Sequence, residues 1–516
     1  MGLSITSGEA RVSALRSLGV RRLVLVVHDS CFPSTPEEDI GRGSPYSAGA
    51  LEFLRWARSL GFDGVQLGPQ GQTSRGNSSP YDSAIFRRNF LSISLGALAD
   101  PAARAALAQI VAQRPPGTHV HYLHAYDAQE AALRALCGDR EPFEVFCERV
   151  AEDQHRTFQR AARELGLKLF GDLHIGFSPE EARELEHLLL PGYLMGAPPS
   201  RTNPDGQPWN FPVLFPVIDP AHREAVKQVM GGRLDRLFGD FDGVRIDHPH
   251  GWVDPWVYRS DDPDRLHAVQ HGARLCSSPD LADHPALARY AIAEPAQLDR
   301  RLARHADAWV GSLRDDQVER YGMLFSVAID RAAAHGRDPA DIICEVLSTW
   351  PYPLCAVMTR HALGRFCVTQ KANLDDPSDV YRSENARPAD WIMVGNHDTR
   401  PIWRVAETWA ATPQLERRAR YVSERLATDI PAEAHSVVNA MFADLFASPA
   451  ENVQIFFADL LGMNDVYNVP GTVAHENWTL RVPNDYVRVH AERAARGAAL
   501  DLDRALELAL RARGLS

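Results

Sequence analysis

The chain has 516 residues, of which 45% are hydrophobic and 24% are charged, and its formal net charge is −12. These values are ordinary for a globular protein, and they exclude a disordered, collagen-like or disulfide-rich chain. A net negative chain attracts polyanions poorly, so we expect neither nucleic acid nor an anionic membrane as a partner.

Short apolar runs rich in β-branched residues recur along the chain and alternate with helical patterns. Alternation of this kind predicts parallel strands joined by helices. Eight such units are the content of a (β/α)8 TIM barrel, an α/β fold. In chain order, the predicted strands are residues 21–27, 64–67, 168–175, 243–246, 341–347, 365–369, 391–394 and 453–457.

The predicted strands are unevenly spaced. About a hundred residues separate the second strand from the third, and the fourth from the fifth, far more than one helix and its connections need. We therefore expect one catalytic barrel domain over residues 1–516 with two helical insertion subdomains. These are residues 97–164, between strands 2 and 3, and residues 259–336, between strands 4 and 5.

The cysteines and the apolar runs predict a location inside the cell. The 7 cysteines include no Cys-x-x-Cys pair, and scattered thiols are typical of a reducing compartment. The chain has no run of about 18 apolar residues, and its start shows no secretory signal. We expect a cytoplasmic protein without a membrane-spanning helix. The sequence indicates no oligomeric state.

Several predicted strands end in polar residues, and in a barrel the catalytic side chains collect at that end of the strands. One polar residue after a strand is common, but five strands with this feature favour a common site. The residues are Asp172, Asp247, Glu345 and the pairs His28-Asp29 and His397-Asp398.

Three of these acids have settings that suit different chemical roles. Arg245 and Asp247 alternate along one strand and share a face, and a neighbouring guanidinium keeps a carboxylate ionised, as a nucleophile requires. Glu345 ends an apolar run, where burial raises the pKa of a carboxyl and suits a general acid. Glu294 lies in a helical region, so we do not expect it to be the acid. Two such carboxyls meet the requirement for retaining glycosyl transfer, and Asp398 is a third acid for sugar hydroxyls.

A metal site is the main alternative for these residues. Asp247, His248, His397 and Asp398 carry side chains that bind metals, but neither pair has a spacing specific to a metal. Glycosyl transfer requires no metal or organic cofactor, and we expect neither.

Seven sequence fragments stand in an order that resembles one enzyme family. They are Leu67-Gly68-Pro69 with Ser79-Pro80-Tyr81, Gly171-Asp172, Gly206-Gln207-Pro208-Trp209, Arg245-Ile246-Asp247-His248, Ile342-Ile343-Cys344-Glu345, Gly395-Asn396-His397-Asp398, and Asn468-Val469-Pro470-Gly471-Thr472. The chain resembles 4-α-glucanotransferases (amylomaltases or disproportionating enzymes), glycoside hydrolase family 77 of the α-amylase clan, from about residue 45 to residue 483. The resemblance implies a TIM barrel, an α-glucan or maltooligosaccharide donor and a sugar acceptor.

The resemblance also implies roles for single residues. Asp247 would be the nucleophile that forms a glycosyl-enzyme, and Glu345 would protonate the leaving oxygen and then activate the acceptor. Asp398 would bind hydroxyls of the sugar next to the cleaved bond. Tryptophans near the motifs are candidates for stacking on sugar rings. The candidate substrate-binding residues are Tyr81, Arg245, His397, Asp172, Trp209, Trp252 and Trp350.

The sequence also departs from the family pattern. Val346 follows Glu345, where the family usually has Asp, and Pro249-His250-Gly251 replaces an aromatic-Arg-Gly loop. The loops that bind a long glucan therefore differ, which indicates retained chemistry on an altered donor or acceptor. Two alternatives stay open: a retaining hydrolase or transferase that acts on a small non-glucan α-glucoside, and a non-catalytic glycan-binding relative. The three intact acids argue against the second.

Overall fold

The computed structural model describes residues 8–84, 87–201, 203–214, 220–472 and 474–515. The chain divides into two compact units. The first unit comprises Met1–Gly171 and Phe366–Ser516, and the second comprises Asp172–Arg365. Among the described residues, no helix combines the length and the apolar character needed to span a bilayer.

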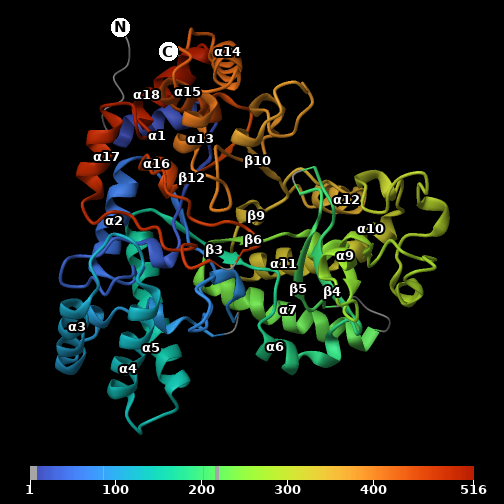
Figure 1. Ribbon diagram of the computed structural model, residues 1–516, viewed down its shortest axis with the longest axis horizontal. Coiled ribbons are helices and arrows are strands. Elements are labelled where there is room, and N and C mark those ends of the chain that lie inside the picture. The colour runs from blue at the N-terminus through green and yellow to red at the C-terminus, as the bar shows by residue number, and fades with distance from the viewer. Residues whose placement is uncertain (1–7, 85–86, 202, 215–219, 473, 516) are drawn as a thin grey trace. The chain divides into compact units, whose positions relative to one another are not determined.

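The main sheet has eight strands that pair in the order β10-β11-β12-β1-β2-β3-β6-β9. Taken cyclically, with β12 paired to β1, this is the chain order of the strands in a (β/α)8 barrel, and β9 and β10 are the two ends of the nearly closed sheet. Figure 1 labels β3, β6, β9, β10 and β12 of this sheet. Each predicted strand region contains one of them, so the predicted fold is confirmed. The first unit holds β1 (Arg22–Val26), β2 (Gly64–Gln66), β10 (Phe366–Val368), β11 (Trp391–Met393) and β12 (Asn452–Phe456), the second holds β6 (Gly243–Ile246) and β9 (Ile342–Cys344), and β3 (Lys168–Leu173) spans the boundary.

Helix α2 of the first unit buries one apolar stripe. In α2, Ser47 caps the first turn, its hydroxyl accepting the Ala50 N–H at 3.1 Å. Phe53, Leu54 and Ala57, at helical spacing, are fully buried. The helices of this unit are α1 (Gly8–Ser17), α2 (Ala48–Ser59), α3 (Pro101–Gln113), α4 (Tyr122–Cys137), α5 (Phe143–Glu164), α13 (Ile402–Trp409), α14 (Gln414–Leu426), α15 (Ala434–Ala447), α16 (Phe457–Leu460), α17 (Tyr486–Ala494) and α18 (Leu502–Ala512).

Helices α3, α4 and α5 lie within residues 97–164 and share a hydrophobic cluster with Ile40 and with the segment from Phe90 to Leu95. Leu107 of α3, Leu133 of α4 and Val150 of α5 belong to it. The buried amide of Gln129 donates to the carbonyl groups of Phe90 and Ile93 at 2.7 and 2.8 Å, which ties α4 to the segment after β2.

The second unit adds a four-stranded antiparallel sheet, β5-β4-β7-β8, that the sequence pattern did not reveal. Its strands are short, and β5 contains Pro208, which weakens the strand signal. Residues 259–336, expected to be helical, therefore also contain β8 and several 3-10 turns beside their helices. The strands are β4 (Tyr193–Ala197), β5 (Gln207–Phe211), β7 (Trp256–Arg259) and β8 (Ala273–Arg274), and the helices are α6 (Pro179–Glu184), α7 (Pro220–Asp240), α8 (His250–Val253), α9 (Arg265–Gln270), α10 (Asp315–Tyr321), α11 (Met323–Ala334) and α12 (Tyr352–Arg360).

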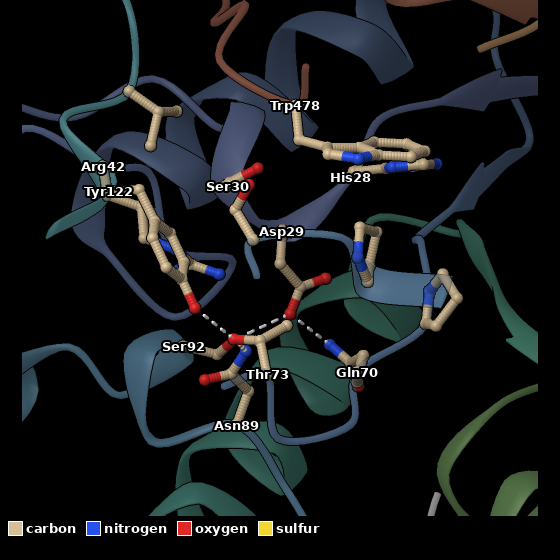
Figure 2. A pocket seen from close by; sticks show the side chains of 14 residues that line it. His28, Asp29, Ser30, Arg42, Gln70, Thr73, Asn89, Ser92, Tyr122 and Trp478 are labelled. Carbon is tan, nitrogen blue, oxygen red and sulfur yellow. Dashed lines mark hydrogen bonds between the residues drawn. The ribbon is translucent and has the colours of Figure 1, made fainter. Parts of the chain in front are cut away.

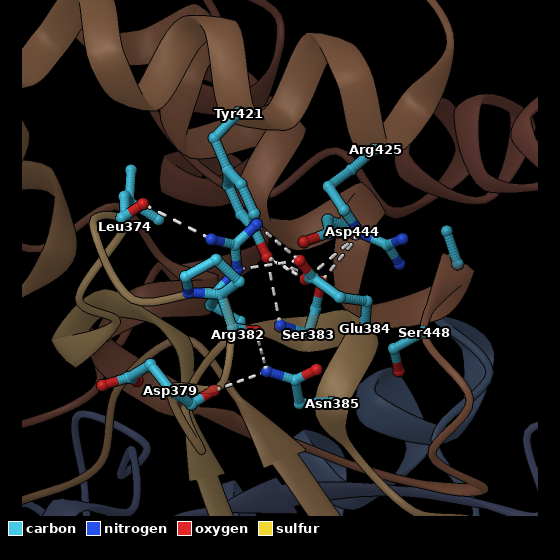
Figure 3. A network of polar contacts seen from close by, with 12 residues as sticks. Leu374, Asp379, Arg382, Ser383, Glu384, Asn385, Tyr421, Arg425, Asp444 and Ser448 are labelled. Carbon is cyan, nitrogen blue, oxygen red and sulfur yellow. Dashed lines mark hydrogen bonds and ion pairs between the residues drawn. The ribbon is translucent and has the colours of Figure 1, made fainter.

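A polar network fixes the long connection from β10 to β11 onto α14 and α15 of the first unit (Figure 3). The Tyr421 hydroxyl donates to Glu384 at 2.6 Å and accepts the Ser383 N–H at 3.1 Å. Arg425 of α14 donates to Asp444 of α15 at 3.0 Å. The connection is thus held to two packed helices before it enters β11, the strand that leads to His397 and Asp398.

Candidate active site

Four charged side chains of the second unit meet at the carboxyl ends of its strands. Asp172 lies on β3, Arg245 lies on β6, Asp247 directly follows β6, and Glu345 directly follows β9. β6 and β9 pair in parallel with their last residues in register, so Asp247 and Glu345 leave the sheet side by side. The backbone N–H of Asp247 also donates to Leu173 at 3.0 Å, which extends the pairing of β6 with β3 beyond the strand end.

Arg245 is the centre of this charge cluster. Its Nη1 donates to both carboxylate oxygens of Asp172, at 2.7 and 2.8 Å, and its Nη2 lies 3.0 Å from Asp247 Oδ1 and 2.9 Å from Glu345 Oε2. The guanidinium side chain is only 1% exposed. Two oxygens this close to one nitrogen are at most about 6 Å apart, which admits the short carboxyl separation of a retaining glycosidase, about 5–5.5 Å.

Burial raises the pKa of Asp247 well above its ordinary value. Arg245 lowers this pKa, whereas Glu345, which also shares a hydrogen bond with Asp247, and Asp172 raise it. Arg245 therefore opposes the effect of burial on Asp247, but its guanidinium is shared among three carboxyls. That Arg245 keeps Asp247 ionised stays a prediction.

Two histidines follow Asp247 and stack on each other. The rings of His248 and His250 are 4.4 Å apart and nearly parallel, and Trp209 of β5 meets His248 edge-on at 4.5 Å. His248 has a left-handed backbone, with φ +42°. Burial lowers the pKa of His248 well below its ordinary value and that of His250 to about 4, so both imidazoles are neutral at neutral pH.

The three candidate tryptophans differ in exposure. Trp209 is partly buried, and Trp350 is partly buried with Arg365 over its ring at 4.8 Å. Trp252 of α8 is buried and meets Phe325 edge-on, with ring centroids 5.6 Å apart. This placement favours a packing role for Trp252 over the sugar-stacking role that we expected.

Rings of the first unit form a second cluster, at the ends of β1 and β11. Tyr81 and His397 stack with their centroids 5.0 Å apart, and His28 and Trp478 stack at 6.0 Å. His28 also lies 5.1 Å from His397, and its Nδ1 shares a hydrogen bond of 3.0 Å with the Tyr467 hydroxyl. The cluster therefore offers aromatic faces and imidazoles that suit a sugar ring.

Asp398 belongs to the same part of the first unit. Its Oδ1 accepts a hydrogen bond of 2.6 Å from the Asn468 amide, and its Oδ2 lies 3.4 Å from His397 Nε2. The Asn396 side chain accepts the backbone N–H of Asp398 at 3.1 Å, which fixes the turn. The Asp398 side chain is 31% exposed, so this carboxyl is accessible to a ligand.

A small polar pocket of the first unit shares His28 and Trp478 with the ring cluster (Figure 2). Inside it, the buried Asp29 accepts hydrogen bonds from Ser92 at 2.8 Å and Gln70 at 2.9 Å. Burial raises the pKa of Asp29. The cavity volume is about 30 Å³, room for one or two water molecules rather than a sugar ring.

The family of the chain follows from a comparison with family models. The model of glycoside hydrolase family 77, described as 4-alpha-glucanotransferase, matches residues 138–486, more than half of the chain. The chain belongs to glycoside hydrolase family 77. It is therefore an enzyme of the glucanotransferase type. No curated protein sequence matches it.

Solved structures show that this family 77 enzyme has an amylomaltase fold. An amylomaltase from Corynebacterium glutamicum is 16% identical with a TM-score of 0.71, and the match covers 96% of this chain and 76% of that one. An amylomaltase from Streptococcus agalactiae in complex with acarbose is also 16% identical, with a TM-score of 0.64 and coverage of 95% and 98%.

The metal-site alternative finds no support in the family 77 chain. Within the described ranges, no group of three or more His, Cys, Asp or Glu side chains is arranged to hold a metal ion. Asp247 and His248 lie in the second unit, whereas His397 and Asp398 lie in the first. Each pair contacts the protein side chains described above.

Sequence reasoning placed His28 at a strand end without giving it a role, and it missed three further residues of the two clusters in this enzyme, Asn468, Trp478 and His250. His28 ends a predicted strand, and Asn468 and Trp478 lie in or beside a family-like fragment, so signals for all three were present. His250 lies in the loop that departs from the family pattern. Its contacts depend on the pairing of β6 with β9, which the sequence alone does not specify.

Proposed function

We propose that the chain is a retaining 4-α-glucanotransferase in which Asp247 is the nucleophile and Glu345 is the acid/base. The observation that carries the proposal is the position of both carboxyls on one nitrogen of Arg245, in a chain of family 77. Retaining transfer needs two carboxyls at short separation, one of them a nucleophile and the other a proton donor.

The reaction takes two displacements. In the first, a carboxylate oxygen of Asp247 bonds to the anomeric carbon while the glycosidic bond breaks, and the leaving oxygen takes the proton of Glu345. In the second, Glu345 removes the proton of an acceptor hydroxyl, whose oxygen replaces Asp247 at the anomeric carbon. The mechanism requires the proton on Glu345 when the donor reacts. Arg245, which lowers the pKa of Asp247 against the effect of burial, favours the ionised nucleophile.

We assign the binding of the donor sugar to Tyr81, His397 and Asp398 of the first unit, as the family resemblance implies. Stacked rings and a partly exposed carboxyl are the groups that bind a sugar face and its hydroxyls. In the second unit, Trp209 is our candidate for a stacking face, and Asp172 acts through Arg245 rather than on the sugar.

We propose an α-glucan or maltooligosaccharide as donor and a sugar hydroxyl as acceptor. The altered loops keep a small α-glucoside as the second candidate donor. All 7 cysteines are free thiols, which supports a cytoplasmic location. We treat the chain as one catalytic domain with insertions at residues 97–164 and 259–336.

The test is incubation with maltotriose and chromatography of the products. A ladder of longer glucans with glucose supports transfer, and glucose with maltose alone indicates hydrolysis. Asp247→Asn and Glu345→Gln should each abolish the ladder. Glu294→Gln is the matched control, because Glu294 is an exposed partner of Arg314, at 2.8 Å, away from the strand ends. Activity that survives Asp247→Asn would overturn the proposed nucleophile.

A further inference from the structure

The loop that carries Glu345 is tied to the segment that follows Asp247. Glu345 begins the connection between β9 and α12, residues 345–351. In the middle of this connection, the carbonyl oxygen of Thr349 lies 3.1 Å from Nε2 of His250, three residues after Asp247. A carbonyl oxygen only accepts, so Nε2 carries the proton and donates it to Thr349.

His250 stands on a rigid support. It begins α8, whose next residue is Gly251. A Cβ at Gly251 would lie 2.6 Å from the side chain of Ile175, just after β3, and 3.0 Å from the sulfur of Met195 on β4. The following residue, Trp252, is buried against Phe325. Because α8 is packed this tightly, His250 is the fixed partner and the Glu345 loop is the part that the hydrogen bond holds.

The rest of the His250 ring is shielded by the protein. His248 stacks on one face at 4.4 Å. Nδ1 is buried, and within the described part of the chain it has no hydrogen-bond partner. A nitrogen that is shielded from solvent cannot exchange a proton with a sugar, so the geometry assigns His250 to positioning and not to acid/base chemistry.

We propose that His250 positions Glu345 for proton transfer, by holding Thr349 at a fixed distance from the segment that follows Asp247. This inference rests on the proposed function, because it takes Glu345 as the proton donor. Arg245 joins the two carboxyls directly, and the bond from His250 to Thr349 joins their loops a second time. A one-residue change here should therefore weaken proton donation and leave the attack by Asp247 in place.

The test uses two donors with different needs. The leaving oxygen of maltotriose must be protonated, whereas the fluoride of α-glucosyl fluoride leaves without a proton. His250→Asn moves the side-chain donor to the wrong place, because its amide nitrogen superimposes near Nδ1. His250→Gln is the matched rescue, since its amide nitrogen reaches the place of Nε2. For both variants, kcat/KM is measured with each donor, as transfer from maltotriose and as fluoride release.

We expect His250→Asn to lower kcat/KM for maltotriose by about 30-fold and to leave fluoride release within about threefold of the wild type, and His250→Gln to restore maltotriose transfer. Glu345→Gln is measured in parallel and shows how kcat/KM changes with each donor when proton donation is lost completely. Asp247→Asn should lower kcat/KM with both donors. Three results would each overturn the proposal. In His250→Asn, kcat/KM could fall equally with both donors or fall with neither, and His250→Gln could fail to restore transfer from maltotriose.

Hydrogen exchange of the whole protein separates this proposal from the proposed function. Amide exchange in the peptide that covers residues 345–351 should be faster in His250→Asn than in the wild type and normal in His250→Gln. Unchanged exchange in His250→Asn overturns the role of His250 whatever Glu345 does. If exchange is faster in His250→Asn but Glu345→Gln keeps full activity, the assignment of Glu345 as the acid/base is wrong instead.

Discussion

The charge cluster of the second unit and the ring cluster of the first differ in how their polar groups are satisfied. In the second unit, Asp172, Asp247 and Glu345 surround one buried guanidinium, so each carboxyl depends on the same cation. In the first unit, Asp398 is partly exposed and is held by the neutral amide of Asn468. Shared, buried charge suits bond making and proton transfer, and exposed, neutral contacts suit binding. The predictions below test this division.

The largest expected effect is that of Arg245→Lys. A single ammonium cannot bind both oxygens of Asp172 and also contact Asp247 and Glu345, so the carboxyls lose their common partner. We expect kcat/KM for fluoride release to fall at least about 10³-fold and the free energy of unfolding to fall by about 3 kcal/mol. Kinetics and urea unfolding measure the two effects.

The control for Arg245→Lys is Arg314→Lys. Arg314 also contacts two carboxyls, Glu294 at 2.8 Å and Asp316 at 3.0 Å, but it is exposed. Exposed ion pairs contribute less than about 1 kcal/mol, so activity and stability should stay near those of the wild type. An Arg245→Lys enzyme within tenfold of the wild type would mean that the shared cation does not organise the site.

Asp459 of the first unit is a buried acid for which the described part of the chain supplies no ion-pair partner, so it contrasts with the carboxyls that surround Arg245. Burial raises its pKa to about 7, and only the backbone N–H of Ile402 lowers it. The folded protein therefore keeps a proton that the unfolded chain releases between about pH 4 and pH 7, so this carboxyl makes the protein less stable as the pH rises through that range.

We expect Asp459→Asn to remove this dependence. The free energy of unfolding of the variant should exceed that of the wild type by about 2 kcal/mol at pH 8 and by much less at pH 4.5. Urea unfolding at both values measures the difference, with the exposed Asp429→Asn as the control. A variant that is less stable than the wild type at pH 8 would show that Asp459 has a cationic partner or a bound water network.

The sequence predicted the strands far better than the contacts between them. The eight barrel strands follow from apolar runs alternating with helices, and the shared face of Arg245 and Asp247 follows from the two-residue period of a strand. The contact between Arg245 and Glu345 depends on the register of β6 and β9, which lie about a hundred residues apart in the chain. Long-range register of this kind has no local signal, and the same reason hid the contacts of His250.

A smaller effect is expected at Asn468, which holds Asp398 by a neutral hydrogen bond of 2.6 Å. Asn468→Ala should lower kcat/KM for maltotriose by about tenfold, because one lost hydrogen bond costs about 1 kcal/mol or somewhat more. Asn439→Ala is the matched control, since its amide donates to His435 and Gly497, which are not members of either cluster. Unchanged activity in Asn468→Ala would remove the support for a sugar contact by Asp398.

The smallest effect on activity is expected at Trp252, whose position next to a family-like fragment predicted that it stacks on a sugar ring. The side chain is 8% exposed and packs against Phe325, so a sugar cannot reach its face. Trp252→Phe should cost about 1 kcal/mol of unfolding free energy and leave kcat/KM within about threefold, because it shrinks the core and spares the charge cluster. A KM rise in Trp252→Phe without a loss of stability would return Trp252 to the binding site and show that α8 opens to admit substrate.

Trp209→Phe tests the partly buried ring beside His248, and we expect its main effect in KM.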